Sequence, residues 1–162
     1  SSAASDVYKR QVRDRLEELG VECFLPVQTV LRQWTYRKSR VVVPVIAGLV
    51  FVRVSRQEQV KVLQTKGVVA FLRLKGEAGA AVIPDKQMED FRFLLDFSEE
   101  AVEMTNENIK AGDLVRVVKG SLRGMEGELI RHKGVTKVLV RIDMLGCAMV
   151  NIPASFVEKL NK

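Results

Sequence analysis

The sequence predicts an α+β protein in which a helix-packed antiparallel or mixed sheet domain precedes a small closed β-barrel. Residues 7–97 alternate helix and strand patterns in an order close to α-β-β-β-α-β-β-α, which favours one sheet packed by helices. Residues 98–111 are acidic and polar with little periodicity, which is typical of a linker. Residues 112–162 carry five short strand patterns with glycines at the turns, and closing them into a barrel removes most exposed strand edges.

The composition is that of a folded protein whose charge would suit a polyanionic partner. The chain has 162 residues, of which 47% are hydrophobic and 28% charged, and its formal net charge is +6. Cys23 and Cys147 form no CxxC motif and no histidine cluster accompanies them, so neither zinc nor a disulfide is expected and a reducing cytosol fits best. No run approaches the roughly 20 apolar residues that span a bilayer, and the first residues lack the order of a signal peptide. We therefore expect a soluble, cytoplasmic monomer without a membrane partner.

The first domain is expected to begin with a helix that follows a short tail. Residues 1–6 are small and polar and predict a segment outside the fold. Val12, Leu16 and Leu19 then share one helical face, which predicts a helix over residues 6–19 with its stop at Gly20. Four strand patterns follow, over residues 22–27, 29–36, 40–46 and 49–54. The second and third of these should form a hairpin whose basic tip projects into solvent.

A capping signal marks the next helix. Ser55 and Glu58 have the spacing of a capping box, in which the serine oxygen accepts from an early helix N–H and the glutamate reaches back. The sequence therefore predicts a helix over residues 56–65. We expect it to bury Val60, Leu63 and Val62.

The first domain should end with two short strands and a third helix. Strand patterns cover residues 68–74 and 81–83. Asp85 is then expected to cap a helix that fades near Phe97. The apolar face of this helix would consist of Met88, Phe91 and Leu95, with Leu94 beside them.

Basic residues dominate the middle of the first domain. Between Cys23 and Gly76 the only acidic residue is Glu58. Ten basic residues share this stretch: Arg32, Arg37, Lys38, Arg40, Arg53, Arg56, Lys61, Lys66, Arg73 and Lys75. Such a face can neutralise phosphates in a sequence-independent way, or simply keep the protein soluble. Trp34 and Tyr36 stand beside the hairpin tip, where they could stack on unpaired bases or pack at the rim of the core.

The sequence predicts no catalytic site, metal site or cofactor. The one histidine, His132, has no nucleophile motif or recognisable carboxylate pair near it, so we expect a surface residue rather than a general base. Phosphate-cradling glycine motifs and HExxH are absent from the sequence. We expect a binding protein, not an enzyme.

The barrel strands are expected at closely spaced intervals in the second domain, residues 112–162. They fall over residues 114–118, 128–132, 137–143, 149–152 and 156–160. Gly124 and Gly127 lie between the first two, where a backbone conformation or a close approach that a Cβ would obstruct explains them best. An ordinary hairpin with a long loop would account for the same glycines.

The second domain resembles the KOW motif and its SH3-like barrel. The resemblance rests on residues 112–127, Arg141–Gly146 and Ile152-Pro153. The residues that carry the motif are Gly112, Asp113, Gly120, Gly124 and Gly127. The upstream half is similar in order and spacing to the N-terminal domain of the NusG family. That similarity rests on residues 21–26, 43–46, 48–52 and 65–71. The resemblance extends over about residues 7–160.

The resemblance implies a transcription elongation or antitermination factor without catalysis. The N-terminal domain would dock on the clamp helices of the largest RNA polymerase subunit and suppress pausing or termination, while the KOW domain recruits a ribosomal protein or a termination factor. By position, Leu49, Phe51, Phe71 and Ile83 would contribute to the clamp-facing patch, although burial in the sheet core would also explain them. Basic residues that would approach non-template DNA or nascent RNA are Arg10, Arg13, Arg37, Lys38 and Arg40.

Some positions depart from the family. Ala47 and Leu49 stand where proline and an aromatic residue are usual, and Lys66 stands where proline is usual, which favours a specialised paralogue. Residues 141–148 resemble paralogues from Bacteroides-like bacteria that regulate polysaccharide operons by antitermination. Family members open with an aromatic-rich strand that residues 1–6 do not resemble, so we expect that strand to be absent and to leave a gap in the sheet. The alternative interpretation is a ribosome- or RNA-binding KOW protein. A small-molecule enzyme is the interpretation that the sequence supports least.

Overall fold

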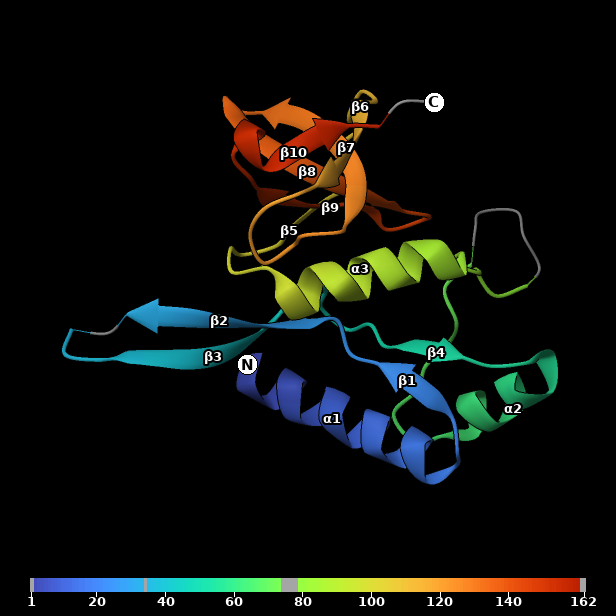
Figure 1. The fold of residues 1–162 in the computed structure, drawn as a ribbon. Helices are drawn as coiled ribbons and strands as arrows, with labels where there is room; N and C mark the ends of the chain where they lie inside the picture. The colour runs from blue at the N-terminus through green and yellow to red at the C-terminus, as the bar shows by residue number, and fades with distance from the viewer. Residues whose placement is uncertain (1, 34, 74–78, 161–162) are drawn as a thin grey trace. The chain divides into compact units, whose positions relative to one another are not determined.

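A computed structural model describes residues 2–33, 35–73 and 79–160, with the side chains of residues 2–7 and 32 excepted (Figure 1). The chain divides into two compact units. The first unit comprises residues 1–27 and 46–81, and the second comprises residues 28–45 and 82–162. Among the described residues, no helix combines the length and the apolar character that crossing a membrane requires.

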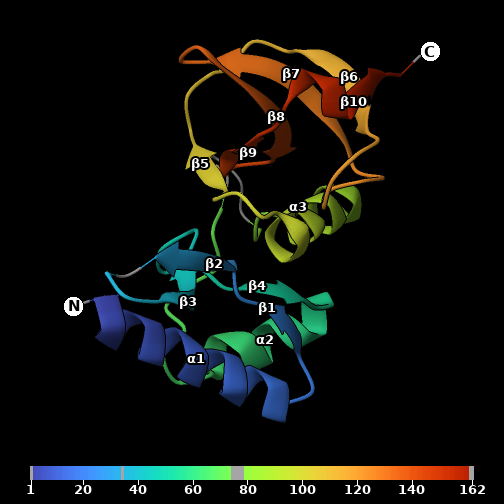
Figure 2. The same ribbon diagram turned by 60° about the vertical axis from the view of Figure 1, so that its left-hand side comes forward.

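The first unit packs two helices against a two-stranded antiparallel sheet. Its elements are α1 (Ser2–Glu18), β1 (Glu22–Phe24), β4 (Phe51–Arg53) and α2 (Arg56–Gln64). Cys23 of β1 lies opposite Val52 of β4. Both helices lie on one side of the sheet, as Figure 2 shows. The core between these layers is a cluster of Val12, Leu16, Val21 and Val62, and we refer to it as the helix-side core.

Helix α1 starts earlier than the sequence predicts. It begins at Ser2, so most of the residues expected to form a tail are helical. The predicted stop is confirmed, because Gly20 has a φ of 78° and its N–H donates to the carbonyl of Glu17 at 2.9 Å. The Tyr8 hydroxyl of α1 donates to the Gly67 carbonyl at 2.7 Å, and this bond attaches the turn after α2 to α1.

The capping box of α2 is confirmed, but its burial is not as predicted. The Glu58 N–H donates to Ser55 Oγ at 3.3 Å, and the Ser55 N–H donates to Glu58 Oε1 at 3.2 Å. Val62 is buried, whereas Val60 and Leu63 are 55% and 46% exposed. Successive residues of a helix are about 100° apart, so Val60 lies almost opposite Val62 and only one of the two can face the helix-side core.

The strands expected over residues 68–74 and 81–83 do not form in residues 68–73 or 79–83, and residues 74–78 lie outside the described part. Val68 and Phe71 nevertheless pack against the helix-side core, while Val69 is 94% exposed. The apolar pattern is thus satisfied by side-chain packing without a strand ladder. One backbone bond, from the Ala81 N–H to the Leu72 carbonyl at 2.6 Å, joins the two segments.

The second unit combines a long hairpin, a helix and a barrel. The hairpin consists of β2 (Val27–Gln33) and β3 (Lys38–Pro44), and the helix is α3 (Asp85–Phe97). Helix α3 buries Phe91, Leu94 and Leu95. Its cap differs from the prediction: Asp85 is already the first helical residue, and the preceding Pro84 makes no side-chain capping bond.

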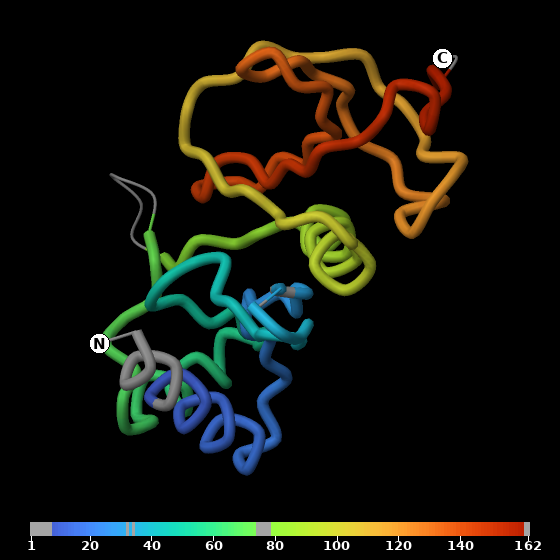
Figure 3. Tube along the Cα trace, turned by 90° about the vertical axis from the view of Figure 1, so that its left-hand side faces the viewer, coloured from blue at the N-terminus to red at the C-terminus, as the bar shows by residue number. Residues whose placement is uncertain are grey.

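The barrel is a six-stranded antiparallel sheet with the order β10-β6-β7-β8-β9-β5. Figure 3 traces the path of its chain, coloured from yellow to red. Its elements are β5 (Glu103–Thr105), β6 (Asp113–Val117), β7 (Glu126–His132), β8 (Val135–Ile142), β9 (Gly146–Asn151), the short 3₁₀ helix η1 (Ala154–Phe156) and β10 (Val157–Lys159). Five of the strands match predicted ones. The sixth, β5, lies in the stretch predicted to be a linker and pairs with β9, with Met104 opposite Ala148.

Candidate binding surfaces

The β2–β3 hairpin presents a basic face with an exposed aromatic residue at its turn. Along β3 the exposed residues Lys38, Arg40 and Val42 alternate with half-buried ones. Tyr36, in the turn, is 96% exposed. Trp34, expected beside the tip, lies outside the described residues. The sequence-predicted basic residues of the tip, Arg37, Lys38 and Arg40, are thus all exposed, and Lys38 and Arg40 share one face of β3.

The base of this hairpin is held by a buried amide that the sequence analysis missed. Gln28 in β2 is 2% exposed. Its Nε2 donates to the carbonyl of Glu100 at 2.8 Å, and its Oε1 accepts from the N–H of Val102 at 2.8 Å. Ser98 Oγ donates to the same Glu100 carbonyl at 2.6 Å. Since buried polar groups need partners, Gln28 fixes the segment after α3 to the root of the hairpin.

The basic residues predicted on α1 belong to the first unit, separate from the hairpin. Arg10 is exposed. Arg13 is half-buried, and its Nη2 forms an ion pair with the Asp14 carboxylate at 3.2 Å. Arg13 is thus partly neutralised within its own helix, whereas no ion pair is found for Arg10 within the part of the chain that the structure describes.

The four residues predicted for the apolar patch have different surroundings. Phe51 in β4 stacks on Phe24 of β1, with ring centroids 6.0 Å apart and an interplanar angle of 29°. The residues on either side of Phe51, Val50 and Val52, pack against the helix-side core. Because side chains alternate across a strand, Phe51 and Phe24 lie on the other face of the sheet.

Phe71 is partly buried against the helix-side core, so it takes part in packing beneath the sheet. Leu49 is half-buried and precedes Val50 in the same extended stretch as Phe51. Ile83 is half-buried and belongs to the second unit. Leu49, Phe51 and Phe71 therefore belong to the first unit, where Phe71 contacts the helix-side core. Ile83 belongs to the second unit.

Two of the predicted KOW residues, Gly124 and Gly127, lie where backbone constraints require glycine. Gly124 has a φ of +96°, which L side chains rarely adopt, and its N–H donates to the Val117 carbonyl at 2.8 Å. A Cβ on Gly127 would lie 2.9 Å from the Leu139 carbonyl oxygen. Both of the sequence-based explanations, an unusual conformation and a close approach, are confirmed. Asp113 forms an ion pair with Lys159 at 3.3 Å, and Gly120 lies in the loop after β6.

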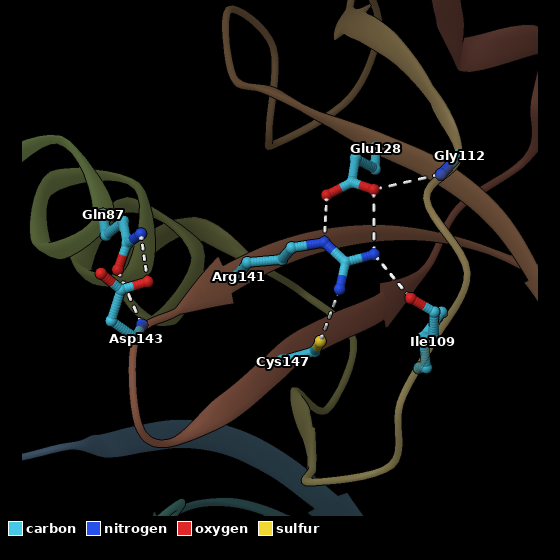
Figure 4. A network of polar contacts seen from close by, with 7 residues as sticks. All are labelled: Gln87, Ile109, Gly112, Glu128, Arg141, Asp143 and Cys147. Atoms are coloured by element: carbon cyan, nitrogen blue, oxygen red, sulfur yellow. Dashed lines mark hydrogen bonds and ion pairs between the residues drawn. The ribbon is translucent and has the colours of Figure 1, made fainter. Parts of the chain in front are cut away.

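A polar network on the barrel, drawn in Figure 4, connects strands β7 and β8 to the chain before β6. Arg141 Nε donates to Glu128 Oε2 at 2.7 Å, and Arg141 Nη2 donates to the Ile109 carbonyl at 2.8 Å. Glu128 Oε1 accepts from the Gly112 N–H at 3.1 Å. The hydrogen bond with Glu128 raises the pKa of Arg141. Nothing in the sequence indicates this network, because it depends on the register of β7 and β8.

A second contact in the same view joins α3 to the end of β8. The Asp143 N–H donates to Gln87 Oε1 at 2.8 Å, and Gln87 Nε2 donates to Asp143 Oδ1 at 3.0 Å (Figure 4). Asp143 is exposed and Gln87 is half-buried. The helix thus has a specific polar contact with the barrel within the second unit.

His132 differs from the surface residue that we expected. Its side chain is 14% exposed, and its Nε2 lies 3.0 Å from Glu107 Oε2. The hydrogen bond with His132 lowers the pKa of the Glu107 carboxyl. In the described part of the chain, no group of three or more histidine, cysteine, aspartate or glutamate residues is arranged to hold a metal ion.

One comparison with known proteins, a family model, identifies a family. A family model described as "Transcription termination factor nusG" matches residues 5–92, which is more than half of the 162 residues. A solved structure described as "Domain interaction in Thermotoga maritima NusG" is 22% identical, with 99% of this chain and 93% of that chain covered and a TM-score of 0.45. Another, described as "Crystal Structure of MjSpt4:Spt5 complex conformation B", is 16% identical, with 98% and 90% covered and a TM-score of 0.23. The search of curated proteins gives no match.

Proposed function

Because the chain belongs to the NusG family of transcription elongation factors, we propose that it binds RNA polymerase and suppresses pausing or termination. The family match over residues 5–92 carries this proposal. In the proposal the first unit supplies the polymerase contact, and the barrel recruits a ribosomal protein or a termination factor. The protein acts in the cytoplasm by binding alone, without a cofactor.

The stacked pair of Phe24 and Phe51 is the strongest candidate for the polymerase contact. These two half-buried rings lie on the sheet face opposite the helix-side core. Aromatic side chains at the centre of an interface often supply much of its binding energy. Leu49 extends the same patch, whereas Phe71 and Ile83 remain proposals with weaker support, because Phe71 packs against the core and Ile83 lies in the second unit.

Co-purification with RNA polymerase and a pause assay in vitro test the proposal. Phe51→Asp should abolish co-purification and restore pause lifetimes, since a carboxylate cannot be buried unpaired at an apolar interface. Phe97→Asp is the matched control, because Phe97 is an exposed phenylalanine on α3 and its substitution should leave polymerase binding intact. Circular dichroism on both variants excludes unfolding as the cause. Unchanged pause lifetimes at saturating wild-type protein would contradict the elongation role.

The specialised role in polysaccharide operons is part of the proposal and has its own test. Residues 141–148 support it by their resemblance to such paralogues. A factor of this type should affect transcription of few operons, so depletion followed by RNA sequencing should change readthrough at a small set of long transcripts. A uniform change across all genes would instead indicate a general elongation factor.

The exposed basic hairpin favours one alternative, a KOW protein that binds ribosomal or other structured RNA. Sedimentation separates the two functions. Salt-resistant co-sedimentation with ribosomes, in the absence of polymerase binding, would favour the alternative.

A further inference from the structure

We propose that Lys9 of α1 is a positioning residue for the polymerase contact, because its ammonium group holds the turn that leads into β4. Lys9 is 5% exposed, and its Nζ donates to the carbonyl of Ile46 at 2.7 Å. The inference rests on the proposed function and deepens it. It gives α1 a part in presenting Phe24, Phe51 and Leu49, which we refer to as the Phe51 patch.

Lys9 lies on the face of α1 that packs into the first unit. Val12 and Leu16, three and seven residues further along the helix, belong to the helix-side core, and residues at these spacings share one helical face. A lysine is almost never fully buried unless its charge has a partner. The Ile46 carbonyl is such a partner, so the bond to it has to persist for Lys9 to stay buried.

The turn before β4 has few other restraints. Residues 46–49 follow β3 without regular secondary structure. In the part of the chain that the structure describes, the bond from Lys9 is the one hydrogen bond found for their backbone. Val50 then packs against the helix-side core. The turn is therefore held at two points, by Lys9 at Ile46 and by side-chain packing at Val50.

The consequence for the Phe51 patch differs between its members. Phe51 lies in the β1–β4 ladder opposite Phe24, so strand pairing holds both rings. Leu49 is half-buried, lies outside the ladder and follows Ile46 by three residues. Loss of the bond from Lys9 would thus release Leu49 first. Side chains that are ordered before binding lose less conformational freedom on association, so release of Leu49 weakens the interface.

Lys9→Met tests the inference, because methionine keeps the unbranched stem and removes the charge and the donor. Binding is measured as the fluorescence anisotropy of the labelled full chain, titrated with RNA polymerase in the absence of nucleic acid. We expect a loss of about tenfold, which corresponds to about 1.4 kcal/mol and to one hydrogen bond from a charged group. The midpoint of urea unfolding should stay close to that of the wild type, since removal of a buried charge offsets the lost bond.

Two further variants separate the hydrogen bond from the charge. In Lys9→Arg a guanidinium can donate to the same carbonyl, so this variant should bind polymerase at least about threefold more tightly than Lys9→Met. Lys61→Met is the matched control, because Lys61 is exposed on α2 of the same unit and its loss lowers the net charge equally. This control should bind polymerase like the wild type.

Methyl order parameters from NMR give a readout that a change in global stability does not move. In the wild type the methyl groups of Leu49 should be more ordered than those of Leu63, which is exposed on α2. In Lys9→Met they should approach the values of Leu63. The methyl groups of Leu16, in the helix-side core, should remain unchanged.

Three results would overturn the inference. They are a Lys9→Met variant that binds polymerase like the wild type, an equal loss of binding in Lys61→Met, and wild-type Leu49 methyl groups as mobile as those of Leu63. The last of these is measured on the wild type, so it decides the matter even where Lys9→Met does not fold. Wild-type protein that does not bind polymerase would contradict the proposed function, while the order parameters would still show whether Lys9 holds the turn.

Discussion

Glu128 holds the guanidinium of Arg141 through two hydrogen bonds, from Nε to Oε2 at 2.7 Å and from Nη2 to Oε1 at 3.1 Å. The same carboxylate accepts the Gly112 N–H. Glu128→Gln removes the charge and one acceptor oxygen, so we expect it to lower the free energy of unfolding of the barrel by about 1–2 kcal/mol. Urea unfolding followed by the amide signals of β7 and β8 measures this loss.

The neighbouring pair of Arg116 and Glu126 is the control for this prediction. It joins β6 to β7 with an N–O distance of 2.9 Å, but both side chains are more than 40% exposed. Exposed pairs contribute little, so Glu126→Gln should change barrel stability by less than about 0.5 kcal/mol. Equal losses from the two substitutions would show that the network around Glu128 is not special.

Gln28→Ala should loosen the chain between α3 and the barrel. The substitution leaves the Val102 N–H without its acceptor and the Glu100 carbonyl without one of its donors. An unsatisfied buried group costs about 1–3 kcal/mol. We expect the segment around Val102 to open locally, so that water can hydrogen-bond to the N–H that has lost its acceptor. Hydrogen exchange at Val102 should therefore accelerate by about tenfold or more. Gln33→Ala, at an exposed position on the same strand, should leave that rate unchanged, and protection of Val102 in both variants would rule out the anchoring role.

The success of the sequence predictions depends on how local each feature is. The capping box at Ser55 and the stop at Gly20 were correct because each involves residues within one helical turn. The apolar periodicity of α2 predicted a helix but not which side of it faces the core. Val62 is buried as expected, whereas Val60 was expected to be buried and is exposed. The strand expected over residues 68–74 does not form in residues 68–73, because alternation specifies which side chains are buried without supplying a hydrogen-bonding partner.

Features that depend on distant parts of the chain were missed. Strand β5 lies in an acidic stretch of low periodicity and forms only because β9 offers an edge. The pair of Glu128 and Arg141 requires the register of two strands, which residue patterns do not give. At the candidate binding surfaces, the basic hairpin tip was predicted from composition. The different surroundings of Phe51 and Phe71 could not be predicted from the sequence, because both residues occur in similar apolar runs.

Gly112→Ala should destabilise the barrel because the new Cβ would collide with the backbone carbonyl of Leu129. A backbone group cannot rotate away as a side chain does, so the chain before β6 has to shift and the Gly112 bond to Glu128 is lost. We expect a loss of more than about 2 kcal/mol, measured by thermal unfolding. Gly134→Ala is the comparison: its Cβ would meet open space, and only its φ of +79° opposes the change, at a cost of about 1 kcal/mol. A smaller loss at Gly112 than at Gly134 would contradict the steric argument.

The two cysteines should report separately on the two units. Burial raises the pKa of both thiols, so less of the reactive thiolate is present near neutral pH in the folded protein than in the unfolded chain. Cys147 in β9 is 3% exposed, whereas Cys23 in β1 is half-buried. An aromatic disulfide reagent at pH 8 should therefore modify Cys23 first and Cys147 only when the barrel opens.

Because Glu128→Gln weakens the network beside Cys147, this substitution should accelerate modification of Cys147 and leave the rate at Cys23 unchanged. Modification of Cys147 at the rate of the denatured protein would show that the barrel does not protect it, and an unaltered rate in Glu128→Gln would separate the network from barrel opening.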